Sequence, residues 1–272
     1  MGGRSRASGR RGGSAGDLSK GAIVVLSGGF IDVMNPEDVR DRMDDYIADV
    51  NADPYVQAHT NGKGLKFKLW KDQPDPHIHQ AEWRRVARVL QALKPSPLVV
   101  VGHSNGGAAA VSIARSLAAG GTAVDLLCTH DTVQTVDDLG DPNRVPANVR
   151  LNLNPYVIPT PAWMLAPFPI GRRNVREADG SMDGVINVGL TYNLGGAFAH
   201  KNAFYEIAGG NKVPGGGFER PHLLLDVTLA VLRGTSTPDV LQLMRPPLQT
   251  LATRSRIVIE LETKGLRQTI RP

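Results

Sequence analysis

The chain lacks covalent cross-links and membrane spans, so its stability must come from a buried core. Cys128 is the single cysteine among 272 residues, which excludes intramolecular disulfides. Aromatic residues make up only 5% of the sequence, and no apolar run approaches the length of a membrane span. With 41% hydrophobic and 21% charged residues, the composition is typical of a water-soluble globular protein with one large domain.

Residues 1–20 contain almost no apolar side chains and are dominated by Gly, Ser and Arg. This composition predicts a disordered basic tail, and we expect deletion of residues 1–18 to leave the melting temperature nearly unchanged. Without an apolar stretch the tail does not resemble a secretory signal, so we expect a cytoplasmic protein. A basic tail can bind nucleic acid or an anionic surface, but most such segments are simply solvated, and no nucleic-acid partner is expected.

The strongest signal is a motif at residues 98–107, which read Leu-Val-Val-Val-Gly-His-Ser-Asn-Gly-Gly. An apolar run, predicted as a buried strand, leads into a Gly-x-Ser-x-Gly pentapeptide, and an Ala-rich helix follows. Strand, sharp turn and helix are the context in which this pentapeptide forms a nucleophile elbow. We therefore expect Ser104 to be a nucleophile. The alternative is a chance pentapeptide within a buried α/β unit.

The residues around the serine suit a tight turn. Side chains at Gly102 and Gly106 would collide with the neighbouring strand and helix, so glycine leaves the room that the turn needs. Because a helix begins just after the serine, its free N–H groups and positive end point toward the reacting centre. The N–H of Asn105 is then expected to be one oxyanion donor.

Apolar runs alternate with helical periodicity along most of the chain, which predicts an α/β protein. We expect a mostly parallel, doubly wound sheet of about six strands between helical layers, a three-layer α/β/α arrangement over residues 21–234. Residues 155–183 are rich in Pro and are interpreted as a candidate lid. Residues 235–272 are expected to form a C-terminal extension with one extra strand over 256–261. The predicted strands are 22–26, 65–70, 98–101, 123–128, 149–153 and 184–194. In 65–70 apolar residues alternate with lysines, so we expect this strand nearer an edge of the sheet.

A serine nucleophile needs a base. Around an elbow of this kind the chain order is serine, acid, histidine, so the histidines before Ser104 are disfavoured. His200 lies in a loop shortly after the last predicted core strand, at the edge of the sheet where the serine also belongs. His222, at the start of the next predicted helix, remains the alternative base.

The base in turn needs an acid that orients it. Asp131 directly follows the predicted strand after the elbow and is the first candidate. Asp137 and Asp138 are rivals that are expected in a surface turn. The second oxyanion donor is expected in the loop after the first strand, from the N–H of Gly29 or Phe30, unless that loop is an ordinary glycine turn.

Metal and cofactor motifs are weak or absent in the sequence. Residues 75–79 read Asp-Pro-His-Ile-His, but no further cluster has the spacing that would complete a metal site. No phosphate-binding loop of the Gly-x-x-x-x-Gly-Lys type occurs. We therefore expect neither a metal nor a cofactor.

The elbow, the Gly-Gly-Phe loop at 28–30 and the Thr-His-Asp strand end at 129–131 together resemble the α/β-hydrolase superfamily. The Ala-His-Lys-Asn loop at 199–202 looks like the loop that carries the base in small bacterial lipase-like hydrolases. The resemblance covers residues 22–234 and implies hydrolysis of an ester or thioester through an acyl-serine intermediate. A small-molecule or lipid-like acyl ester would be the substrate. A thioesterase, an acyltransferase and a non-catalytic binding protein of the same fold remain alternatives, because the fold does not determine the function.

Overall fold

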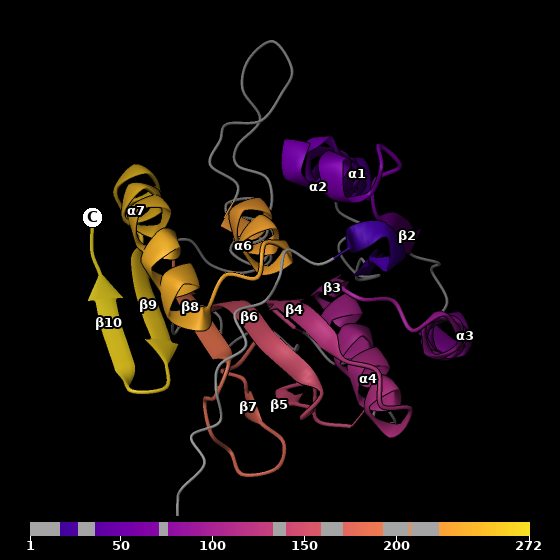
Figure 1. Ribbon diagram of the computed structural model, residues 1–272. Helices are drawn as coiled ribbons and strands as arrows, with labels where there is room; N and C mark the ends of the chain where they lie inside the picture. The colour runs from indigo at the N-terminus through magenta and orange to yellow at the C-terminus, as the bar shows by residue number, and fades with distance from the viewer. Residues whose placement is uncertain are drawn as a thin grey trace, which may run out of the picture.

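The computed structural model describes residues 17–26, 36–70, 76–132, 140–158, 171–192, 207 and 223–272. Its centre is an eight-stranded sheet in the order β10-β9-β8-β6-β4-β3-β1-β2 (Figure 1). The strands from β2 to β8 pair in parallel, and the hairpin β9–β10 joins antiparallel to β8. The strands of the sheet are β1 (Ala22–Leu26), β2 (Lys66–Trp70), β3 (Leu98–His103), β4 (Val124–His130), β6 (Val149–Val157), β8 (Val185–Thr191), β9 (Val258–Thr263) and β10 (Leu266–Ile270).

Strands β1, β3 and β4 lie inside the sheet, and apolar residues dominate their sequences. Every residue of β1, β3 and β4 is buried, as expected for parallel strands covered on both faces. The amphipathic strand β2 lies at the edge of the sheet, as its sequence predicts. The α/β class and the mainly parallel sheet are thus confirmed. The main sheet has six strands within residues 21–234, as expected, and the antiparallel hairpin β9–β10 extends it to eight.

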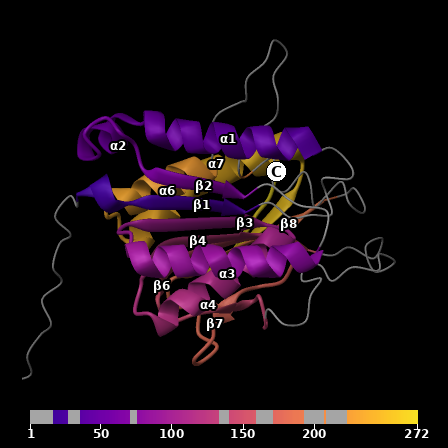
Figure 2. The same ribbon diagram turned by 90° about the vertical axis from the view of Figure 1, so that its right-hand side faces the viewer.

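Helices cover both faces of the sheet, an arrangement compatible with three α/β/α layers. Figure 2 shows α1, α6 and α7 on one side and α3 and α4 on the other. Two buried apolar clusters correspond to these two sides. The helices are α1 (Pro36–Ala52), α2 (Pro54–His59), α3 (Pro76–Leu93), α4 (Asn105–Ala119), α6 (Leu223–Leu232) and α7 (Thr237–Ser255). Among the described residues, no helix combines the length and the apolar character that crossing a bilayer requires.

The folded domain begins before residue 21. The Asp17 carboxylate accepts a 2.9 Å hydrogen bond from the Ser19 N–H and caps a short 3-10 helix, η1 (Leu18–Lys20). The Leu18 side chain is buried in the cluster on the α1 side. Residues 17–20 therefore form an ordered turn that Leu18 attaches to the core, and a deletion through residue 18 removes a core side chain.

The C-terminal residues are an integral part of the domain rather than an extension. Four side chains of α7, Val240, Met244, Leu248 and Leu251, follow the helical period and are buried against the rest of the protein. Strand β9 then pairs with β8, and β10 forms the edge of the sheet. The sequence predicted one extra strand here, whereas the structure has a 19-residue helix followed by two strands.

The predicted excursion over 155–183 is shorter than expected, because part of it belongs to the sheet. Residues 155–157 continue β6, so the strand is four residues longer than its apolar sequence indicated. Residues 171–183 carry the short strand β7 (Val175–Arg176), which pairs with β5 (Arg144–Val145) in a separate two-stranded sheet. The middle of the predicted lid, residues 159–170, lies outside the described residues.

Buried amides hold residues 171–176 against the sheet. Asn152, Asn154 and Asn187 point to the same face because they alternate along β6 and β8 with the buried apolar residues of the other face. Asn154 Nδ2 donates to Asn187 Oδ1 at 2.7 Å, and Asn187 Oδ1 also accepts from the Asn174 N–H at 2.8 Å. We call these four asparagines, with Thr129 on β4, the asparagine network.

Further bonds join the asparagine network across three strands. Asn174 Nδ2 donates to Thr129 Oγ1 at 2.7 Å and to Asn152 Oδ1 at 3.0 Å. Asn154 Nδ2 also donates to the carbonyl of Arg172 at 2.8 Å. Buried polar groups are costly unless they are hydrogen-bonded, so these mutual bonds make the buried amides tolerable. The network fixes how residues 171–174 lie on the sheet.

Candidate active site

Ser104 occupies a strained turn between β3 and α4. Its backbone has φ 56° and ψ −124°, a region that is sparsely populated by residues other than glycine. The residue stands at the N-cap of α4, yet its side chain makes no capping hydrogen bond. Serine at an N-cap normally uses its hydroxyl for that purpose. The Ser104 hydroxyl therefore does not serve as a helix cap.

Glycine is required on both sides of the serine. A Cβ on Gly102 would lie 2.2 Å from the carbonyl oxygen of Gly106 and 2.7 Å from the Cα of Gly107. A Cβ on Gly107 would lie 2.3 Å from Thr132 Oγ1. These separations are shorter than real Cβ contacts. Because Gly102 and Gly107 have no Cβ, strand β3 can pack closely against the start of α4, and α4 against the end of β4.

Backbone hydrogen bonds tie the elbow to the adjacent strand. The Ser104 N–H donates to the carbonyl of His130 at 2.9 Å, and the Gly107 N–H donates to the carbonyl of Ser104 at 3.0 Å. His103 and His130 are register partners of β3 and β4, and both side chains are fully buried with ring centroids 5.7 Å apart. The carboxyl ends of β3 and β4 are therefore in register, and this pairing places residue 131 beside the elbow.

Asp131 lies where the sequence predicts an acid, at the end of the strand next to the elbow. The side chain is buried, and its Oδ1 accepts a 3.0 Å hydrogen bond from the Val157 N–H of β6. Its own N–H donates to the carbonyl of Pro155 at 2.7 Å, and its φ of 40° departs from the strand conformation. Two bonds to β6 therefore fix a buried carboxylate at the edge of the sheet where the serine also lies.

One of the predicted oxyanion donors, Asn105, lies within the described residues. Asn105 is the first residue of α4, where backbone N–H groups have no partner within the helix. The other candidates, Gly29 and Phe30, lie outside the described residues. Leu26, the last residue of β1, pairs in register with Gly102, so the chain leaves β1 next to the elbow. That pairing is consistent with the predicted contribution from the loop after β1.

Both candidate bases, His200 and His222, lie outside the described residues, as do Asp137 and Asp138. Strand β8 ends at Thr191 and α6 begins at Leu223, so both histidines belong to the connection between these two elements. His59, which chain order disfavours, ends α2 with its ring stacked on Tyr55 at a centroid distance of 3.9 Å.

No group of His, Cys, Asp and Glu in the described segments could hold a metal ion.

Two polar atoms beside the elbow lack partners within the part of the chain that the structure describes. Asn105 Oδ1 and Thr132 Oγ1 are buried there without a hydrogen bond. Asn105 follows the serine, and Thr132 follows Asp131 and packs against Gly107. Atoms far from the elbow, such as Trp83 Nε1 and Thr122 Oγ1, are also buried without a partner among the described residues, so this feature alone does not identify a site. Sequence reasoning missed Thr132, because only its position after the strand could have drawn attention to it.

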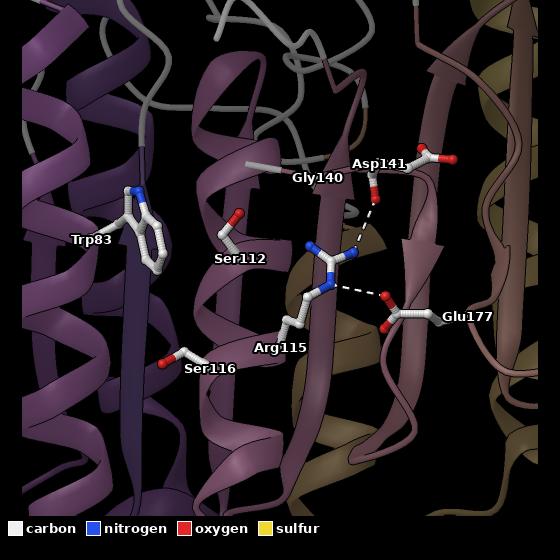
Figure 3. A pocket seen from close by; sticks show the side chains of 7 residues that line it. All are labelled: Trp83, Ser112, Arg115, Ser116, Gly140, Asp141 and Glu177. Carbon is white, nitrogen blue, oxygen red and sulfur yellow. Dashed lines mark hydrogen bonds and ion pairs between the residues drawn. The ribbon is translucent and has the colours of Figure 1, made fainter. Parts of the chain in front are cut away.

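A hollow of about 510 Å³ lies away from the elbow, on the outer side of α4 (Figure 3). Its lining residue Ser112 is eight positions from Ser104, roughly 12 Å along the helix. Arg115 Nε donates to Glu177 Oε1 at 3.0 Å, and Nη2 donates to the carbonyls of Asp141 and Arg144 at 3.1 and 3.4 Å. Figure 3 shows the guanidinium directed at Glu177 and Asp141. These bonds join α4 to the segments around β5 and β7, which is a structural role.

The chain matches no protein-family model, no curated protein and no solved structure. Arguments about its function therefore depend on its own residues.

Proposed function

We propose that the protein is a serine hydrolase of the α/β-hydrolase fold that cleaves a carboxylic ester through an acyl-serine intermediate. The observation that carries this proposal is the backbone of Ser104, with φ 56° and ψ −124° between a buried parallel strand and a helix. Strain of this size is kept only where the surrounding structure requires it, and such residues cluster at active sites. A chance Gly-x-Ser-x-Gly sequence would not need the left-handed turn or the glycine contacts around it.

The proposed reaction assigns one role to each candidate residue. Ser104 Oγ attacks the acyl carbonyl, while His200 accepts its proton and later activates water. Asp131 holds the imidazole in the required tautomer and stabilises its protonated form. The N–H groups of Asn105 and of the loop at Gly29 and Phe30 stabilise the oxyanion. An acyl ester of a small molecule or lipid is the proposed substrate, and the reaction needs no cofactor.

A serine-reactive fluorophosphonate, followed by mass spectrometry of the labelled peptide, tests the proposal directly. We expect the wild type to be labelled at Ser104 and to hydrolyse at least one member of a p-nitrophenyl ester panel of varied chain length. Ser104→Ala should lose labelling and about a million-fold in turnover while remaining folded. Labelling of Ser104 without ester hydrolysis would favour an acyltransferase or thioesterase. A wild type that is neither labelled nor active would favour a non-catalytic binding protein.

A further inference from the structure

We propose that Gly171 is a positioning residue that sets the orientation of the Asp131 carboxylate, and that the asparagine network holds Gly171 in place. The inference rests on the proposed function, in which Asp131 orients the base. Gly171 is distant from Asp131 in sequence and from every motif, so sequence reasoning did not find it.

The contact between the two residues is unusually close. A Cβ on Gly171 would lie 2.2 Å from Asp131 Oδ1 and 3.1 Å from the Asp131 Cα. Gly171 does not have a left-handed backbone, so the position tolerates alanine conformationally. Glycine is therefore needed here for space, and the space it leaves is occupied by a carboxylate oxygen.

The same carboxylate oxygen is held from a second direction. Asp131 Oδ1 accepts the 3.0 Å hydrogen bond from the Val157 N–H, while the backbone of Gly171 limits how far the group can turn. A side chain at residue 171 would push Oδ1 off the Val157 N–H. A carboxylate displaced in this way could no longer present its other oxygen in the orientation that the base requires.

The asparagine network fixes the backbone that carries Gly171. Asn154 Nδ2 donates to the carbonyl of Arg172, the next residue, at 2.8 Å. Two residues further on, the Asn174 N–H donates to Asn187 Oδ1 at 2.8 Å. Since Asn154 is one residue before Pro155, which accepts from the Asp131 N–H, the same stretch of β6 holds both Asp131 and the segment that packs on it.

Gly171→Ala, assayed in the full chain, tests the inference, and Gly120→Ala is the matched control. The three atoms nearest to a Cβ on Gly120 all belong to the Gln91 side chain, at 3.3 Å or more, and none is backbone. We expect Gly171→Ala to lower kcat by about 100-fold, since displacements near 1 Å can have effects of that size, with KM nearly unchanged. Gly120→Ala should behave as the wild type. Asn154→Ala, which removes the bond to Arg172, should lower kcat in the same way by a smaller factor.

The pH profile separates positioning from general loss of structure. A well-placed carboxylate stabilises the protonated imidazole, so its displacement lowers the pKa of the catalytic histidine. The acidic limb of kcat/KM against pH should therefore move to lower pH in Gly171→Ala and in Asn154→Ala. A loss of folded protein would lower the whole profile without moving that limb, and such a result in either variant would overturn the role assigned to it.

A double variant covers the case in which Gly171→Ala does not fold. Asp131→Ala removes the carboxylate, so adding Gly171→Ala to it should cost no further activity or melting temperature. An equal loss in both backgrounds, or a double variant that also fails to fold, would overturn the inference and indicate a clash with the Tyr156 Cβ or the residue-131 Cα, each of which would lie 3.1 Å from a Cβ at residue 171. If wild type is labelled at Ser104 and Gly171→Ala behaves as Gly120→Ala, this inference fails while the proposed function stands. An unlabelled, inactive wild type would refute the proposed function instead.

Discussion

The Ser104 N–H donates a 2.9 Å hydrogen bond to the carbonyl of His130, the residue directly before Asp131. One backbone bond thus links the turn that carries the candidate nucleophile to the strand end that carries the candidate acid. Because Asp131 is bonded in turn to the backbone of β6, three adjacent parallel strands contribute to the same site. The geometry depends on main-chain contacts, so substitutions that move the backbone should affect it most.

Gly102→Ala should disrupt the elbow. The new Cβ would stand 2.2 Å from the Gly106 carbonyl oxygen, which is backbone and cannot swing away. We expect a loss of at least about 1–3 kcal/mol of unfolding free energy, as for other overpacked sites, and a fall in turnover of more than about 100-fold. Denaturant unfolding and ester hydrolysis measure the two effects. Wild-type values for both would contradict the described turn.

The two candidate bases can be separated by substitution. His200→Gln should reduce turnover by about a million-fold, as removal of a triad histidine does, whereas His222→Gln should retain most of the activity. Steady-state kinetics on the best ester of the panel provide the measurement. The reverse result would assign the base to His222 without affecting the nucleophile.

Residues 1–16 should be dispensable for stability, whereas Leu18 should be required for it. Deletion of residues 1–16 should leave the melting temperature unchanged, because such a tail has little to pack. Leu18 is only 2% exposed, so Leu18→Ala should cost about 2–5 kcal/mol of unfolding free energy, as other buried leucines do. Denaturant titration of the two variants is the test. Equal stability would show that η1 does not belong to the core.

Stability should decline in alkaline solution through two buried groups. Burial raises the pKa of the Cys128 thiol and of the Tyr46 hydroxyl above their ordinary values of 9.0 and 10.0. Both groups are neutral when protonated, so they ionise more readily in the unfolded chain. Their contribution is complete below pH 9 and is lost as the pH rises above it.

Substitution of Cys128 separates the contribution of the thiol to alkaline destabilisation from that of the Tyr46 hydroxyl. Cys128→Ala removes the thiol, so the decline in unfolding free energy should begin near pH 10, where tyrosine ionises in unfolded chains, rather than near pH 9. Denaturant unfolding at intervals between pH 7 and 10.5 measures this onset. An onset that does not move in Cys128→Ala would argue against a fully buried thiol.

The parts of the fold that the sequence predicts are those with a local signal. Short runs of mainly apolar residues identify β1, β3 and β4, and Lys-Phe-Lys-Leu-Trp correctly identifies an edge strand. Helix α7 was missed because Pro246 and Pro247 lie inside it, and proline removes a backbone donor and usually ends a helix. The buried period of Val240, Met244 and Leu248 was present, and tertiary packing outweighed the local cost.

The residues of the candidate site also differ in whether a local sequence pattern predicts them. Ser104 and its glycines were found because the elbow is a local pattern, and Asp131 because it directly follows a strand. Gly171 and the asparagine network had no local signal. Asparagine is usually exposed, so alternation in Leu-Asn-Leu-Asn at 151–154 does not indicate that both faces are buried. Only the pairing of β4, β6 and β8 brings those amides together.

The asparagine network contains amides and one hydroxyl but no ionisable group. Its bonds neither gain nor lose protons, and added salt has no charges there to screen. The Arg115–Glu177 pair near β7 is charged and partly exposed, so added salt should weaken it. The bonds that hold Arg172 and Asn174 on the sheet should hence persist at high ionic strength and over the pH range in which the protein is folded, whereas the partly exposed Arg173–Glu262 pair in the same segment should weaken with added salt.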